Sequence, residues 1–168
     1  MMPPALRKLA LTGHIISSVG WIGAVISFLA LVVTALISKE PQTVRAVYVA
    51  MELLGWFAIV PLAIASLLSG LIMSFGTKWG LFRHYWVLFK LLLTLISILV
   101  LLLNMQSVSF LADKAAGTDK VDLAGLQGEL LHSGVGLIFL FVITVLSVYK
   151  PKGMTRYGMR KRARSQTS

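Results

Sequence analysis

Three histidines and two glutamates are the only side chains in this chain that could do chemistry next to its apolar helices: His14, His84, His132, Glu52 and Glu129. Ionisable residues inside a membrane are costly, so each is by default a candidate functional residue. The chain contains no cysteine, which excludes thiolate catalysis, disulfides, iron–sulfur clusters and covalent c-type haem. Any chemistry therefore depends on imidazole and carboxylate groups.

Axial ligation of a b-type haem needs two imidazoles at similar depth on facing helices. His14 and His84 are expected on the same side of the membrane, and a tilt of the first helix would narrow the difference in their depths. His132 is expected near the opposite face. The sequence leaves open whether His14 and His84 bind haem b or whether His14 is a hydrogen-bonded structural residue.

Glu129 and His132 share a helix face because they are three residues apart, and Glu52 begins another helix at a similar depth. Two carboxylates and an imidazole can hold a divalent metal ion or accept a proton. The alternative is a salt bridge or hydrogen bond from Glu52 to His132 that closes this end of the bundle.

Four long apolar runs must position these residues. Of the 168 residues 57% are hydrophobic and only 13% are charged, which is typical of an integral membrane protein. The runs predict an all-α bundle of four transmembrane helices within residues 1–150, with helices at about 9–37, 46–76, 85–112 and 129–149. Pro61 predicts a distortion of the second helix near residues 57–61, and Lys90 is expected to extend its amine to the membrane surface.

The charges predict that both termini are cytoplasmic in the plasma membrane. All six acids fall on one side, and twelve of the sixteen basic residues fall on the other: Arg7, Lys8, Lys78, Arg83, Lys90, Lys150, Lys152, Arg156, Arg160, Lys161, Arg162 and Arg164. Basic residues accumulate on the cytoplasmic side of membrane proteins.

The tail at residues 151–168 carries much of the net charge of +10. Its basic residues, together with Lys150, are expected to rest on anionic lipid headgroups: Lys150, Lys152, Arg156, Arg160, Lys161, Arg162 and Arg164. A partner-binding tail is the alternative. No nucleic-acid recognition fold accompanies this charge.

Small residues recur every three or four positions in the first helix: Gly13, Ser17, Gly20, Ala24 and Ser27. Such a stripe lets helix backbones approach closely in lipid, so we expect it to pack against another helix of the bundle or against a second copy in a homodimer.

The stretches HIISSVGWIGA and GLFRHYWVLFKLLL resemble a group of bacterial four-helix integral membrane proteins of unassigned function, of the kind found in actinobacteria. The resemblance is carried by His14, Trp21 and Gly23 in the first helix, and by Tyr85, Trp86 and Lys90 at the start of the third. It covers about residues 5–155. More distantly, the chain is similar to copper-resistance D type proteins and small b-type membrane cytochromes, which implies haem or copper as a ligand.

These observations favour a structural or interaction protein of the bacterial membrane, without an enzymatic activity of its own. A redox protein that binds haem b or a metal is the first alternative. A subunit of a small-molecule transporter is the second, although the central parts of the four runs carry no charge.

Overall fold

The computed structural model describes residues 2–38, 40–76, 81–117, 123–151 and 153–164, but not the side chains of residues 116, 117, 123, 124 and 161–164. The described residues form helices and contain no strand: α1 Pro4–Ile37, α2 Pro41–Leu54, a π-helical turn Gly55–Ile59, α3 Val60–Gly76, α4 Tyr85–Gly117, α5 Leu123–Tyr149 and α6 Arg156–Arg164. Four helices in the described ranges are long and apolar enough to cross a membrane, with α2, the π turn and α3 forming one of them. The all-α expectation is thus confirmed, with helices longer than predicted at several ends.

Prolines and one left-handed residue set the helix boundaries. Pro4 and Pro41 begin α1 and α2, at the position where a missing backbone N–H costs nothing. At the far end of α5, Lys150 has φ 45° and Pro151 follows it. A proline cannot continue the helix, so the chain leaves the bundle at this point.

The π-helical turn Gly55–Ile59 lies immediately before Pro61. A proline lacks the N–H that bonds four residues back and its ring crowds that carbonyl, so the helix must adjust just upstream. The sequence predicts this distortion near residues 57–61, and the structure has it within about one turn of that position. The Met105 side chain of α4 occupies the space next to Gly55 that a Cβ would need.

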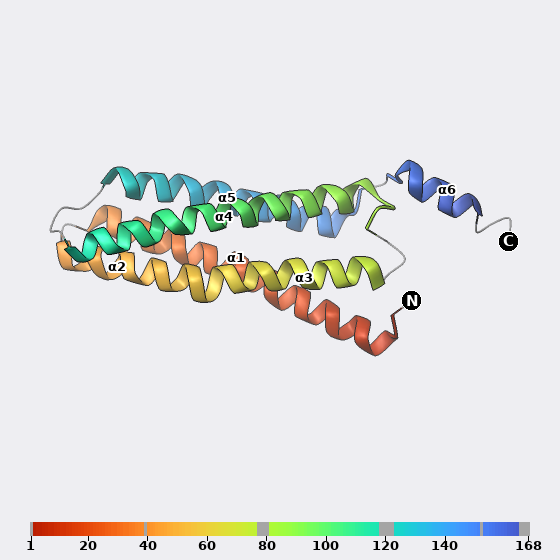
Figure 1. The fold of residues 1–168 in the computed structure, drawn as a ribbon, viewed down its shortest axis with the longest axis horizontal. Coiled ribbons are helices and arrows are strands. Elements are labelled where there is room, and N and C mark those ends of the chain that lie inside the picture. The colour runs from red at the N-terminus through yellow and green to blue at the C-terminus, as the bar shows by residue number, and fades with distance from the viewer. Residues whose placement is uncertain (1, 39, 77–80, 118–122, 152, 165–168) are drawn as a thin grey trace.

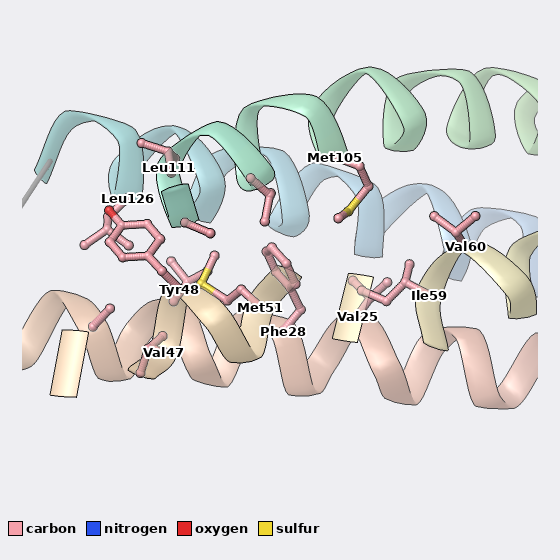
Figure 2. Packing of buried hydrophobic residues seen from close by; sticks show 14 of the residues in the cluster. Val25, Phe28, Val47, Tyr48, Met51, Ile59, Val60, Met105, Leu111 and Leu126 are labelled. Carbon is pink, nitrogen blue, oxygen red and sulfur yellow. The ribbon is translucent and has the colours of Figure 1, made fainter. Parts of the chain in front are cut away.

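The apolar core is concentrated where α1, α2 and α4 meet. The Tyr48 ring of α2 lies beside Leu126 of α5, and Met51 lies between Tyr48 and Phe28 of α1 (Figure 2). These side chains are almost fully buried, with exposed fractions of 4% or less. Close packing of this kind holds helices together even without a hydrophobic driving force between them.

The long helices run side by side, with the start of α1, the end of α3, the start of α4 and the end of α5 at one end of the bundle (Figure 1). Helix α1 packs against α2, α3 and α5, and α4 packs against α2, α3 and α5. This arrangement places His14 near that end and His132 near the other. The first turns of α1 diverge from the bundle (Figure 1).

The segment after α5 folds back on the start of α4. The Thr155 hydroxyl donates to the Phe82 carbonyl at 2.5 Å, and the Thr155 N–H donates to the Arg83 carbonyl at 3.0 Å. The Gly158 Cα lies so close to the Arg83 backbone that a Cβ would be 2.5 Å from its carbonyl oxygen. This C-terminal strap, Gly153–Gly158, fixes where α6 begins.

Candidate functional site

His14 connects α1 to α3. Its Nδ1 lies 3.1 Å from the Ser66 carbonyl oxygen and 3.0 Å from the Ser69 hydroxyl. A carbonyl only accepts, so the hydrogen is on Nδ1. The Ser69 hydroxyl donates to the Ala65 carbonyl at 2.7 Å, which leaves its oxygen as a second acceptor for the same N–H. The imidazole of His14 therefore ties two helices together.

Lys90 occupies the other ring nitrogen of His14. Its Nζ lies 3.4 Å from Nε2, and an ammonium group can only donate. A neutral imidazole with its hydrogen on Nδ1 donates to the Ser66 carbonyl and, through Nε2, accepts from the Lys90 amine. The expectation that Lys90 extends to the membrane surface is wrong, because the half-buried side chain reaches across the bundle to α1. We call His14, Ser66, Ser69 and Lys90 the His14 cluster.

Small residues let α1 and α3 approach at this cluster. The hydroxyls of Ser18 and Ser66 are 2.8 Å apart, and a Cβ on Gly70 would lie 3.3 Å from Cε1 of His14. A Cβ on Gly20 would lie 3.2 Å from the Leu62 side chain. We call this contact the α1–α3 seam.

The predicted stripe of small residues is only partly used there. Ser17 is buried and donates to the His14 carbonyl at 3.1 Å, while Ala24 packs against the core. Gly13 has open space where a Cβ would stand. The seam therefore begins at His14, one residue after the first residue of the stripe.

His84 lies just before α4. Its carbonyl accepts from the Val87 and Leu88 N–H groups, and its backbone pairs with Met154 of the C-terminal strap. The ring nitrogen of His14 that points away from α3 is directed at Lys90. For His14 and His84 to hold a haem, Nε2 of His14 would have to bind the iron in place of its contact with Lys90.

The second group of predicted residues lies at the opposite end, around Glu129. Its side chain is 3% exposed, and the Asn104 amide donates to Oε2 at 2.8 Å. His132 is exposed on the next turn of α5, and Glu52 is half-buried on α2. We call Asn104, Glu129 and His132 the Glu129 cluster.

A metal ion at this end would need several ligands within reach of one point. Among the described residues, no three histidine, cysteine, aspartate or glutamate side chains form a group that could hold a metal ion. Glu52, Glu129 and His132 are all described, so they form no such group. Glu129 is instead connected to α4 through Asn104.

A cavity of about 350 Å³ extends from the Glu129 cluster into the bundle. Its walls are side chains of α1, α4 and α5 with Ile59, mostly apolar, and Asn104 and His132 line it too. A more open recess of about 520 Å³ shares Asn104, Gly128 and His132 with it and includes Glu129. We call the first space the α4–α5 cavity and the second the polar recess.

The predicted headgroup-binding residues follow α5, at the end of the bundle where α1 begins. Lys150, Arg156 and Arg160 are exposed. Lys152 and the side chains of Lys161, Arg162 and Arg164 lie outside the described residues. Within the described part of α6 the basic side chains are therefore available to an anionic surface.

No known protein family, curated protein or solved structure matches this chain. The two clusters must therefore be interpreted from their own geometry. Sequence reasoning identified His14, Glu129 and His132 as candidate site residues, and Ser66 and Ser69 as packing residues that could receive the first helix, but it missed Asn104. Asn104 is the first amide in a long apolar run, and that position could have identified it.

Proposed function

We propose that this protein is a structural or interaction protein of the bacterial plasma membrane, with both termini in the cytoplasm. Its four candidate spans support a multi-pass arrangement, and α1 begins at the same end of the bundle at which α5 ends. The basic residues of the tail belong to the same end as Arg7 and Lys8, which the positive-inside rule assigns to the cytoplasm.

The use of His14 as a helix cross-link carries this proposal. His14 is the residue with the best position for a first haem ligand. Its Nδ1 is within hydrogen-bond reach of Ser66 on α3, and its Nε2 is within reach of Lys90 on α4. Membrane helices commonly use histidine and serine side chains in this way. The cluster therefore makes the α1–α3–α4 part of the bundle a fixed platform.

The outer faces of α4 and α5 are the surfaces that this platform presents. Only 6% of the most apolar window of each helix is buried, against 33% for α1. Leu99 of α4 and Ile138 of α5 are about 60% exposed. Lipid covers such faces in isolation, and another helix of a partner or a second copy replaces it in a complex.

A haem-binding test separates this proposal from the redox alternative. Protein is expressed with ample haem, purified, and its absorption spectrum compared with that of His14→Ala. We expect neither protein to show a Soret band, and His14→Ala to be less stable. A Soret band that disappears in His14→Ala overturns the structural role.

The absence of cysteine makes cross-linking a direct test of the interaction role. Single cysteines at Leu99 and Ile138 are treated with a bifunctional maleimide in native membranes, with buried Val108→Cys as the control. We expect a discrete adduct at Leu99→Cys or Ile138→Cys and none at Val108→Cys. A monomeric band from every variant contradicts the proposal.

A further inference from the structure

The α4–α5 cavity has the shape and size of a small-molecule site. Pockets that hold small ligands between helices occupy about 300–1,000 Å³ and are mostly apolar with a few polar groups. This cavity of about 350 Å³ is walled by aromatic and aliphatic side chains, among them Trp21, Phe28 and Phe139. Leu131 and Val135 of its wall are also exposed at the surface, at 71% and 45%, so the cavity opens sideways between α4 and α5.

The cavity changes character along its length. At one end it meets the polar recess, where the Asn104 amide, the Glu129 carboxylate and the His132 imidazole gather. Toward the other end it is lined by side chains such as Ile96, Phe139 and Leu140. A carboxylate at one end and hydrocarbon at the other match an amphiphile with a hydrogen-bond-donating head.

The wall of the cavity includes a serine on α4. The Ser97 oxygen is buried and has no hydrogen-bond partner among the described residues, although it lines the cavity. Its oxygen has almost no accessible surface, so it contributes no polar contact to a ligand in the cavity. Ser97 lies two helical turns before Asn104, about 10 Å along α4.

We propose that the α4–α5 cavity binds a single-chain amphiphile with a primary amine head. The head lies in the polar recess and donates to Glu129 and Asn104, and the chain lies in the cavity. Glu129 favours a cation because a buried carboxylate in a membrane is costly without one, and Asn104, whose amide donates to it, is neutral. The same carboxylate disfavours an anionic head. This site goes beyond the partner contacts proposed above, and its opening lies on the same side of the bundle, between α4 and α5.

Two glycines of α5 provide a matched pair of variants. A Cβ on Gly136 or on Gly134 would meet nothing within 4 Å, so both positions accept a side chain. Gly136 lines the cavity, whereas Gly134 does not. Gly136→Leu therefore fills the cavity, and Gly134→Leu adds the same side chain to the same helix outside it.

The experiment uses the full-length protein in lipid nanodiscs and a long-chain primary amine with a photoreactive diazirine in its chain. After irradiation, mass spectrometry locates the adduct. We expect labelling of α4 and α5 peptides that line the cavity. We expect Gly136→Leu to remove most of it and Gly134→Leu to retain it. Excess unlabelled amine is expected to compete, the matched carboxylate not to compete, and the matched alcohol to compete more weakly.

The head group has its own test. Glu129→Gln keeps the shape of the side chain and removes its charge, and we expect it to weaken amine binding about tenfold, which is about 1.4 kcal/mol. Circular dichroism and thermal unfolding of each variant confirm that it is folded. Equal competition by amine, alcohol and carboxylate overturns the proposed head group. Equal labelling of Gly136→Leu and Gly134→Leu overturns the cavity as the site.

Discussion

The His14 cluster and the Glu129 cluster use similar polar residues in opposite ways. At the His14 cluster both ring nitrogens meet a partner, and glycine and serine bring α1 and α3 into close contact. At the Glu129 cluster, Asn104 meets the carboxylate while His132 stays exposed beside an open cavity. Polar side chains that hydrogen-bond to one another hold the helices of a bundle together. Polar side chains that line a cavity leave room for a ligand.

The largest contrast is expected from adding a side chain to each region. Gly70→Leu pushes against the His14 ring, which lies 3.3 Å from the Cβ position, and overpacking of this kind costs about 3 kcal/mol. Gly136→Leu meets open space, so it is expected to leave stability unchanged or raise it by up to about 1 kcal/mol. Unfolding by denaturing detergent in mixed micelles measures both. Equal losses of stability in the two variants would contradict the proposed difference between the two clusters.

Removing each histidine gives the next largest difference. His14→Ala leaves the Ser66 carbonyl and the Lys90 amine without this partner, so we expect a loss of about 2 kcal/mol in unfolding free energy. His132→Ala removes an exposed side chain and is expected to change it by less than about 0.5 kcal/mol. The same detergent titration measures both variants. A larger loss in His132→Ala would reverse the roles of the two clusters.

The helices and the distortion before Pro61 were accessible to sequence reasoning, and the pairings of polar side chains between helices were not. Long apolar runs predicted the helices because hydropathy depends on local composition, and Pro61 predicted the distortion that appears at Gly55–Ile59. The partners of His14 lie 52 and 76 positions away, on α3 and α4. Their contact depends on how each helix is rotated about its axis. Because every face of these helices is largely apolar, the sequence does not indicate which face points toward the other helices.

A double-mutant cycle sharpens the assignment of Lys90. His14→Ala and Lys90→Met are measured singly and together, and we expect a coupling of about 1 kcal/mol because the two side chains share one hydrogen bond. The control cycle pairs His14→Ala with Asn104→Ala at the opposite end, where we expect additive losses. A vanishing His14–Lys90 coupling shows that the amine has another partner.

The smallest contrast is between two serines. Ser18→Ala removes the hydroxyl contact to Ser66 across the α1–α3 seam and is expected to cost about 0.6 kcal/mol, the average for such bonds between membrane helices. Ser97→Ala removes a hydroxyl without a partner in the described structure, so in ligand-free protein it is expected to be neutral or slightly stabilising. Replicate detergent titrations resolve the difference. A cost at Ser97 equal to that at Ser18 means that its hydroxyl is already paired.

The C-terminal strap gives the basic tail a mechanical connection to the bundle. Thr155 is bonded to the backbone at Phe82 and Arg83, directly before the helix that carries Lys90. If α6 moved on binding to a charged surface, the C-terminal strap would pass that movement to the first turn of α4. Gly158→Ala is expected to displace α6 from this contact, because the Arg83 backbone leaves no room for a methyl group.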